Sequence, residues 1–546
     1  MSALHRILLG EVPAAERRAE WLGLPGFGSV ADALAAARPA GQALHASGPG
    51  FAIACGSPHA ARIGADLLRA GGNAADAAAG AALAMMVADP PNASPAGRAH
   101  ILYAGCGQEA RAIDGATFAP ATLPEGVHHL PDAQSLPIPG AVRAILRLSA
   151  EAGRLPLRDV VGPARDLARE GFAVPPELAR IWAWRAPELR DPDARRCYLP
   201  GGRAPKAGET FAQPGLAGFF DHLIETGHDP FADPDYAGAF AARMADKGAF
   251  WTAEDLLSAD PPEGETVTLD RDGWRLTSIG RQGWGHTLLR IAGLSAQRTG
   301  DLLEAALAHL LAILRAFEER PEHLRSLSPL PDPLPWGDLE SRLRDPLPGL
   351  AETPRELHAA VSRLSASHAE DRDTTHLSVI DGDGMRVALT QSIGPHFGAR
   401  VADPDTGILI AHSYRMAEAP APGARDVTEQ CPCLLDIGAA RYALGGAGSE
   451  RIPGAVTAVI CGLLEGRGLR DAICAPRVNW VGDTVRAHVD APRGLEQRLA
   501  AAGAPLSFTG RGPVDHLGIV QAAGRRADGT CEAAADPAYS GAALAG

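Results

Sequence analysis

Residues 74–87, AADAAAGAALAMMV, constrain the fold more than any other segment, because nearly all of them are Ala, Gly or Met. In the sequence they come after a first predicted helix at 60–70, which a glycine pair ends. Two prolines, at 90 and 91, end the second predicted helix. A helix that is apolar on every face must be buried with close helix or sheet neighbours. The run FAIACGS at 51–57 is short, apolar and closed by Gly and Ser, which predicts a buried strand.

The remaining pattern changes from helices to strands along the chain. Two strands are expected over 99–120, two amphipathic helices over 139–180, a hairpin over 267–280 and a long helix over about 301–318. A proline-rich exposed loop at 325–354 and a short helix at 355–368 follow, and strands predominate from residue 374, including GILIA (407–411) and TVRAHV (484–489). Because no regular βαβ alternation is present, this order predicts an α+β fold.

Composition narrows the class of protein. The 546 residues are 46% apolar and 21% charged, which is enough for a large core, and the net charge of −14 argues against nucleic acid or anionic membranes as partners. No apolar run reaches the length of a membrane span, and the first residues lack a secretory pattern, so we expect a cytoplasmic protein.

The eight cysteines show no spacing typical of a disulfide framework. Cys431 and Cys433 lack the second pair of ligands that a zinc site needs. We therefore expect neither a metal nor a cofactor.

A threonine pair, Thr374 and Thr375, precedes the β-patterned run HLSVI. Threonine is β-branched and favours strands, so the pair alone indicates little more than a strand start. The turn sequence DGDG at 381–384 predicts a hairpin that places Thr374 opposite Gln391 or Ser392. A hydroxyl or an amide is therefore expected beside Thr374.

A threonine hydroxyl needs a base to become a good nucleophile, and the residue's own α-amino group is one such base. An α-amine has an ordinary pKa of about 7.7–8.0, so a useful fraction is neutral at pH 7. This chemistry requires a free amine on Thr374. The bond between Asp373 and Thr374 is therefore the candidate cleavage site.

An ordered series of blocks resembles the γ-glutamyltranspeptidase family. RAGGNAADAAAGAALAMMVADPP (69–91) is similar to the family's RxGGNAxDAA…VxxP signature, and FAIACGSPHAARIGADLL before it resembles the family's opening strand and helix. The other blocks, in the family's order, are residues 139–179, TAEDL (252–256), DTTHLSVID (373–381), TGILI (406–410), APRVNW (475–480) and ADPAYSGAALAG (535–546). The resemblance covers nearly the whole chain from about residue 50.

The resemblance implies an N-terminal nucleophile hydrolase fold, an αββα sandwich within the α+β class. Such a protein is made as a precursor that cleaves itself, and its large and small fragments form the sandwich jointly. In this chain the expected division is an N-terminal extension (1–50), a large fragment (51–373) and a small fragment (374–546).

The resemblance also implies catalytic roles. Thr374 is expected to be the nucleophile, and Ser392 stands where the family has the threonine that hydrogen-bonds it. Gly448 and Ser449 stand at the glycine pair whose N–H groups form the family's oxyanion hole. Main-chain donors survive a change from Gly to Ser.

The substrate pocket departs from the family. The arginine that holds the α-carboxylate is replaced by Ala116, and the polar and acidic readers of the α-amino group are replaced by Ser413 and Met416. Gly394 replaces a family asparagine. An amino-acid head buried without ion partners costs several kcal/mol, so the γ-glutamyl pocket is not expected to work unchanged.

New cationic or imidazole groups lie near these departures and suggest that an acidic or keto-acid acyl group is still bound, in another way. They are Arg98, His100, His286, His396, His412 and Arg415. The residues expected to contact substrate are Thr375, Gly394, Ser413, Arg415, Thr428 and Ala116.

Three functions follow from this reading. The first is a self-processing amidohydrolase or acyltransferase for a small, non-γ-glutamyl amide. The second is a true γ-glutamyltransferase or glutathione hydrolase. The third is a non-catalytic binding protein, although a dead enzyme has no need of Thr374 or Ser392.

Overall fold

The computed structural model describes residues 29–36, 42–124, 134, 136–296, 301–318, 374–412, 421–481, 484–501, 504–512 and 516–546, with residues 16, 18, 19 and 21. The loop expected at 325–354, the helix expected at 355–368 and Asp373 lie outside these residues. Within the described part of the chain, no helix is both long and apolar enough to cross a membrane.

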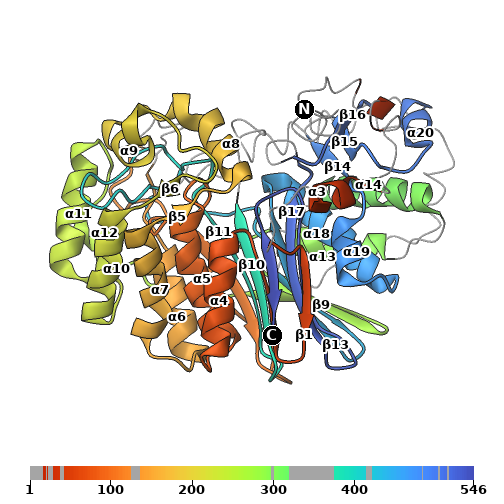
Figure 1. Ribbon diagram of the computed structural model, residues 1–546, viewed down its shortest axis with the longest axis horizontal. Helices are drawn as coiled ribbons and strands as arrows, with labels where there is room; N and C mark the ends of the chain where they lie inside the picture. The colour runs from red at the N-terminus through yellow and green to blue at the C-terminus, as the bar shows by residue number, and fades with distance from the viewer. Residues whose placement is uncertain are drawn as a thin grey trace.

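Two seven-stranded sheets of antiparallel pairs face each other at the centre of the molecule (Figure 1). The first runs in the order β1 (His45–Gly48), β18 (Cys531–Ala535), β17 (Ile519–Arg525), β13 (Ala440–Ala447), β12 (Cys433–Ile437), β9 (Trp274–Ile279) and β8 (Thr266–Arg271). The second runs β19 (Ala542–Ala545), β2 (Phe51–Cys55), β10 (Thr375–Asp381), β11 (Arg386–Ser392), β3 (Arg98–Ala104), β4 (Arg111–Gly115) and β7 (Glu263–Gly264).

Helices cover the outer face of each sheet, which completes an αββα sandwich (Figure 1). The second sheet is covered by α4 (Pro58–Arg69), α5 (Ala74–Ala88) and α6 (Ala141–Ala152), and α7 (Leu157–Glu170) packs on the outside of α5. The first is covered by α13 (Gly285–Ser295), α18 (Ile452–Leu464) and α19 (Leu469–Cys474). The predicted α+β fold and the sandwich implied by the resemblance are confirmed.

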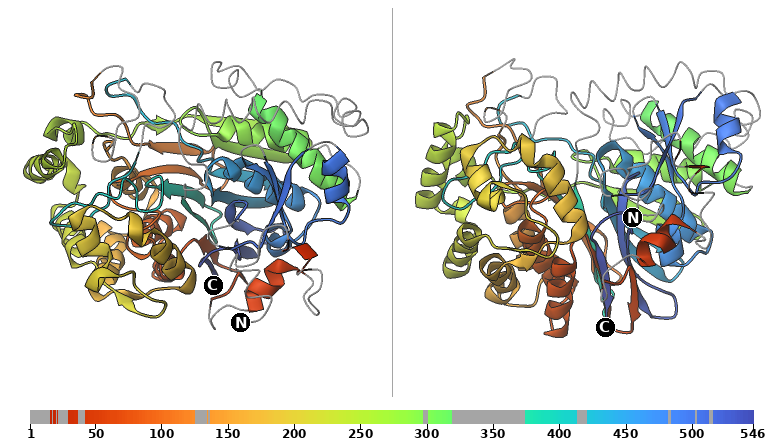
Figure 2. Two further views of the ribbon diagram at one scale, coloured as in Figure 1. Left: turned by 90° about the horizontal axis from the view of Figure 1, so that it is seen from above. Right: turned by 45° about the horizontal axis from the view of Figure 1, so that its top comes forward.

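Shorter elements extend the sandwich at its edges. On the side of the second sheet lie β5 (Phe172–Ala173), β6 (Thr210–Phe211), α8 (Pro176–Arg185), α9 (Pro192–Tyr198), α10 (Pro214–Thr226), α11 (Pro234–Asp246) and α12 (Ala253–Leu257). On the other side, α14 (Leu302–Glu318) and α20 (Leu495–Ala501) pack with the small sheet β14 (Val478–Val481), β15 (Thr484–His488) and β16 (Leu506–Thr509) (Figure 2). Helix α3 (Val30–Ala36) lies near the N-terminus.

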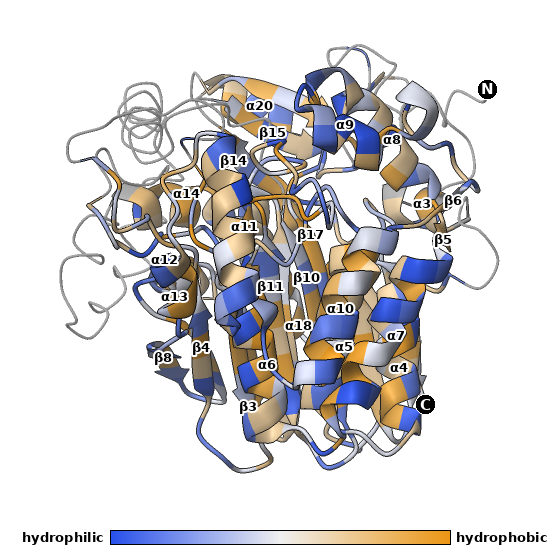
Figure 3. Cartoon of the chain, turned by 90° about the vertical axis from the view of Figure 1, so that its left-hand side faces the viewer, coloured by the Kyte–Doolittle hydropathy of each residue, from blue (hydrophilic) through white to orange (hydrophobic). Residues whose placement is uncertain are grey.

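Helix α5 is buried along its whole length, as its composition predicts. Its small side chains let neighbours approach closely: a Cβ added at Gly80 would lie 2.2 Å from Leu67 Cδ1 of α4 and 3.2 Å from Val160 O of α7. Figure 3 shows the contrast between the hydrophobic α5 and the mixed surfaces of α4 and α7. Since Ala74 N donates to Asp381 Oδ2 over 2.9 Å, the start of α5 is also tied to the end of β10.

Both sheets combine segments from either side of Thr374. Strands β10 and β11 lie between β2 and β3, which precede them by more than 250 residues, and β12 pairs with both β9 and β13. Neither part of the chain therefore holds a complete sheet, and the core requires both.

Two predicted strands differ from the structure. GILIA (407–411) forms only the isolated bridges of Leu409 with Ala402 and of Ile410 with Ala96. TVRAHV is a strand, β15, but it belongs to the small sheet rather than to the sandwich. Alternating apolar residues fit any half-buried extended segment, so the pattern does not specify which sheet a strand joins.

Candidate active site

Thr374 lies immediately before β10, at the end of a central strand, and is 8% exposed. The register pairs Thr375 with Gln391, so its continuation by one residue places Thr374 opposite Ser392. Of the two neighbours that the hairpin predicts, Ser392 is therefore the one that lies opposite Thr374.

The hydroxyl of Ser392 is oriented by the turn that follows β11. Gly394 N donates to Ser392 Oγ over 2.9 Å, and Gly394 adopts a φ of 92°, which favours glycine. A hydroxyl that accepts this bond keeps its own proton available as a donor. Gly394 thus supports Ser392 through its main chain.

Gly448 and Ser449 form a left-handed turn between β13 and α18, with φ values of 122° and 55°. Ser449 begins a 3-10 turn that runs into α18, and its Oγ donates to Glu429 Oε1 over 3.1 Å. A serine in this region of φ is uncommon and persists only where its surroundings hold it. Main-chain N–H groups at the start of a helical segment favour a developing negative charge.

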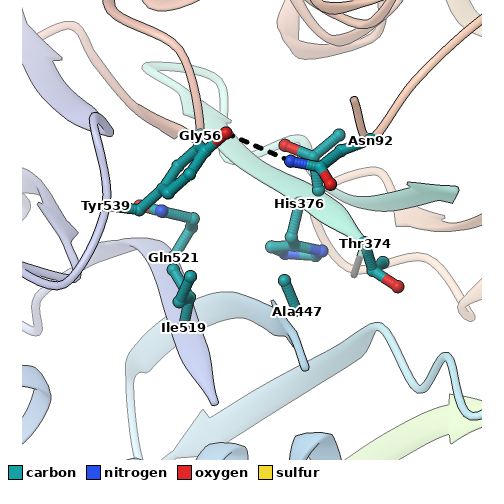
Figure 4. Close-up of a pocket in the computed structure, with 9 residues that line it drawn as sticks. Gly56, Asn92, Thr374, His376, Ala447, Ile519, Gln521 and Tyr539 are labelled. Atoms are coloured by element: carbon teal, nitrogen blue, oxygen red, sulfur yellow. Dashed lines mark hydrogen bonds between the residues drawn. The ribbon is translucent and has the colours of Figure 1, made fainter. Parts of the chain in front are cut away.

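A pocket of about 250 Å³, including its open mouth, adjoins Thr374 (Figure 4). Its lining comes from both sheets and from the loops that connect their elements: Gly56, Asn92, Thr374, Thr375, His376, Ala447, Ile519, Gln521 and Tyr539. Ala447 directly precedes the Gly448–Ser449 turn, so Thr374, the candidate nucleophile, and the residue before this turn line the same pocket. Ile181 of α8 packs in one apolar cluster with Ala447 and Ile519.

Thr375 also lines the pocket, but its hydroxyl lies close to β2 and α5. Thr375 Oγ1 is 3.5 Å from Met85 Sδ, and a Cβ added at Gly56 would lie 2.4 Å from Thr375 Oγ1. Glycine at position 56 therefore makes room for this side chain.

His376 is a buried residue of the pocket that the sequence analysis missed. Its Nδ1 lies 2.8 Å from Thr390 Oγ1 and its Nε2 lies 2.9 Å from Ser378 Oγ. Desolvation lowers the pKa of His376 to about 3, so the ring is neutral at pH 7. Ser378 lies two positions along β10 and Thr390 lies directly opposite on β11, and residues at these positions share a face of the sheet with His376. This spacing is the sequence signal that could have predicted the contacts of His376.

Stability is expected to fall with acid because of His376. The unfolded ring takes up a proton below its ordinary pKa of about 6.5, whereas the folded ring does not until about pH 3. This group therefore destabilises the fold by up to about 1.4 kcal/mol per pH unit below pH 6.5. Urea unfolding of the wild type and of His376→Gln at pH 7, 6 and 5 measures it. Equal pH slopes for the two proteins would contradict the assignment.

Arg98, the β3 residue paired with Ser392, begins a buried polar network. Arg98 Nη1 donates to Asp426 Oδ2 over 2.6 Å, and Arg98 Nη2 donates to His412 O over 3.2 Å. Since Asp426 already balances the charge of Arg98, this arginine does not support the expectation of a bound acidic acyl group.

His100 continues the network through partners inside the protein. Its Nδ1 lies 2.7 Å from Gln430 Oε1 and 3.4 Å from Thr428 Oγ1, and its Nε2 lies 3.3 Å from Asp114 Oδ1. Burial raises the pKa of Asp114, but His100 and Arg425 outweigh it and bring the pKa to about 2. Thr428 therefore sits in this network, and the pocket lining does not include it.

Ala116 is fully buried where the resemblance places a substrate-binding arginine. Another arginine reaches this point from elsewhere in the chain: Arg425 Nε donates to Asp114 Oδ2 over 3.0 Å, and Arg425 Nη2 lies 3.4 Å from Ala116 O. Asp114 therefore already balances the charge of Arg425.

The other predicted residues are only partly placed. Ser413, Arg415 and Met416 lie outside the described residues. His286 is buried at the start of α13, and His396 packs edge-on against Trp184 at 5.9 Å between ring centroids. In the described ranges no group of three or more His, Cys, Asp and Glu residues is arranged to hold a metal ion.

Known proteins resemble this chain over most of its length. The family model described as Gamma-glutamyltranspeptidase matches residues 60–546. Acylase ACY 1 proenzyme of Pseudomonas sp. (strain SE83) is 29% identical over 497 residues, which cover 84% of this chain and 87% of that protein. Glutathione hydrolase proenzyme of Escherichia coli (strain K12) is 25% identical over 526 residues, with 88% of each chain covered.

A solved structure confirms the architecture. Cephalosporin acylase from Bacillus halodurans superposes with a TM-score of 0.78 at 24% identity, covering 93% of this chain and 98% of the other. The αββα sandwich is the fold of N-terminal nucleophile hydrolases, and the family match and the curated relatives make the protein an enzyme of the amidase and acyltransferase type. The chain belongs to the γ-glutamyltranspeptidase family, as the resemblance implies.

Proposed function

We propose that the protein is a self-processing amidohydrolase or acyltransferase whose nucleophile is Thr374. The observation that carries the proposal is the position of Thr374 immediately before β10, opposite Ser392 and in one pocket with Ala447, which leads to the Gly448–Ser449 turn. A nucleophile, a supporting hydroxyl and main-chain donors are the groups that acyl transfer needs.

In the precursor, Thr374 Oγ attacks the carbonyl carbon of Asp373 and gives up its proton to a base. The C–N bond then breaks, the nitrogen of Thr374 takes a proton, and an ester joins Asp373 to Thr374 Oγ. Water hydrolyses this ester, which frees the carboxylate of Asp373 and the α-amine of Thr374. The Gly448–Ser449 turn supplies donors for the oxyanion in each addition step.

In turnover the freed α-amine accepts the proton of Thr374 Oγ as the oxygen attacks a substrate amide. The amine of the substrate leaves with a proton, and the acyl group stays on Thr374 as an ester. Water or an acceptor amine then takes the acyl group and returns the proton to Thr374. Ser392 stabilises the nucleophile oxygen by donating its hydroxyl proton.

Denaturing mass spectrometry of the purified protein tests this assignment. Two fragments are expected, residues 1–373 and 374–546, which associate in the native state because each sheet needs strands from both. A single intact chain, or a cut at another bond, would remove Thr374 from its proposed role.

The substrate is proposed to be a small amide without a γ-glutamyl head. This is supported by Ala116 at the expected arginine position and by the pairing of Arg98 and Arg425 with internal carboxylates. The relatives include both an acylase and a glutathione hydrolase, so either specificity is compatible with the family.

A γ-glutamyl anilide is expected to be cleaved at least about 100-fold less efficiently than the best simple acyl anilide, because an unpaired substrate charge costs about 3 kcal/mol or more. Initial rates of chromophore release across a panel of anilides, taken at equal enzyme concentration, give this ratio. Preference for the γ-glutamyl compound would favour the alternative of a true γ-glutamyltransferase.

A further inference from the structure

Two buried amide side chains in the pocket beside Thr374 carry polar atoms that have no hydrogen-bond partner among the described residues. Asn92 and Gln521 are each 1% exposed. Within the described part of the chain, Gln521 Nε2, Gln521 Oε1 and Asn92 Oδ1 meet no donor or acceptor. A buried polar atom left in this way costs about 1–3 kcal/mol. In native proteins such atoms are usually satisfied by ordered water or by a ligand.

The orientation of Asn92 is set by its neighbours. Asn92 Nδ2 donates to Asp89 Oδ1 over 3.0 Å and to the phenolic oxygen of Tyr539 over 3.1 Å, the latter bond being drawn in Figure 4. Tyr539 OH donates in turn to Asp89 Oδ1 over 2.8 Å. Both protons of the Asn92 amide are thereby used, so Asn92 offers the pocket an acceptor and no donor.

Gln521 supplies the complementary group. It lies on β17, and its main-chain oxygen accepts from Ser378 Oγ over 3.2 Å, which ties this strand to β10 across the two sheets. Its side-chain amide carries two N–H donors and one acceptor oxygen. Gln521 and Asn92 therefore line the same pocket, Gln521 with two donors and an acceptor and Asn92 with an acceptor.

The lining determines the charge and size of the group that fits. Its nine residues include no Asp, Glu, Lys or Arg, and both ring nitrogens of His376 are within hydrogen-bond distance of hydroxyls. A charged group there would have no ion partner, which is costly. The pocket, about 250 Å³ with its open mouth, has room for a small group beside the two amides.

We propose that Asn92 and Gln521 form a subsite for one un-ionised hydroxyl-type group. The group accepts a hydrogen bond from Gln521 Nε2 and donates its proton to Asn92 Oδ1 or Gln521 Oε1. An ordered water and a hydroxyl on the acyl part of the substrate share this chemistry. Binding of a substrate hydroxyl rests on the proposed function, whereas binding of an ordered water does not.

Occupancy is tested without any substrate. A high-resolution crystal structure of the unliganded protein is expected to show density within about 3.2 Å of the two amides. Gln521→Met, which keeps the length of the side chain, is expected to lower the urea midpoint because the bound group loses its partner. A dry subsite combined with a raised midpoint would overturn the proposal, since removing orphaned polar atoms from an empty site stabilises a protein.

Gln213→Met is the matched control for this substitution. Gln213 is also buried, but its Nε2 donates to Val87 O over 2.7 Å and its Oε1 accepts from Tyr198 OH over 3.3 Å. Its replacement is expected to lower the midpoint whether or not the Gln521 subsite is filled. The control therefore gives the drop in urea midpoint that follows the loss of a hydrogen-bonded amide. It also shows that the effect of a Gln→Met substitution on the midpoint can be measured in this protein.

The source of the group is separated with two anilides whose acyl chains differ by a single hydroxyl. A preference of about 10-fold or more for the hydroxylated compound, lost in Gln521→Met, assigns the group to the substrate. Equal turnover of both compounds, with density in the unliganded crystal, assigns it to water. If neither anilide is cleaved, the proposed function fails, while the crystal and the urea midpoint still decide occupancy.

Discussion

Thr374→Ala is expected to yield a single uncut chain with no measurable amidase activity. Without Oγ, no atom on residue 374 can attack the carbonyl of Asp373, and no acyl-enzyme forms. Loss of a nucleophile commonly lowers kcat by about 10⁶-fold, so activity should fall below the detection limit of an anilide assay. Mass spectrometry reads the cleavage and chromophore release reads the turnover.

Two variants make this experiment specific. Thr374→Ser keeps a hydroxyl and is expected to cleave itself, more slowly because the rotamer of serine is less restricted. Thr226→Ala removes a threonine hydroxyl at the end of α10, outside the pocket lining, and should be processed like the wild type. Cleavage of Thr374→Ala at the same bond would show that another residue attacks Asp373.

Asp536→Asn is expected to destabilise the protein by about 3–5 kcal/mol, because it leaves buried arginine charges unpaired. Asp536 Oδ2 lies 2.6 Å from Arg477 Nη1, and its Oδ1 lies 3.5 Å from Arg511 Nε. All three side chains are at most 2% exposed. Despite burial, which raises it, the pKa of Asp536 is held well below the ordinary range by the two guanidinium groups.

The effect should extend to the pocket. The carboxylate of Asp536 also accepts hydrogen bonds from Val520 N and Ala538 N, over 3.2 and 3.0 Å. These residues immediately precede Gln521 and Tyr539, so loss of the charge loosens two lining residues as well as the core.

Urea unfolding at pH 7 measures this prediction. Asp66→Asn is the control, because Asp66 pairs with Arg69 at 2.8 Å on the exposed surface of α4, where such pairs contribute little. Equal unfolding midpoints for Asp536→Asn and the wild type would mean that the two arginines find other partners.

The sequence predicted the elements that depend on neighbours along the chain. The buried α5, the strand β2 and the β8–β9 hairpin occur where apolar patterns, glycines and turn residues place them. In the β10–β11 hairpin, side chains alternate between the two faces of the sheet and the turn is short. The sequence therefore also predicted that a hydroxyl or amide residue would lie opposite Thr374. These features follow from 3.6-residue and 2-residue periodicities, which are properties of local segments.

Pairings between distant segments were not predictable in this way. Three features show this: β15 joins the small sheet, residues 407–411 form isolated bridges instead of a strand, and Arg425 reaches Ala116. Each depends on chain reversals that local sequence patterns do not encode. Arg98 shows the consequence: its charge suggested an anion site, but it pairs with Asp426, which lies 328 residues away in the chain.

By itself, the sequence determined the family and the position of Thr374 before a strand, because each is carried by contiguous motifs. Only the tertiary structure decided which side chains share the pocket. Asn92, His376, Gln521 and Tyr539 are far apart in the chain, and packing alone brings them together. Burial also decides which of their polar atoms are satisfied, since a hydrogen bond depends on atoms that meet in space.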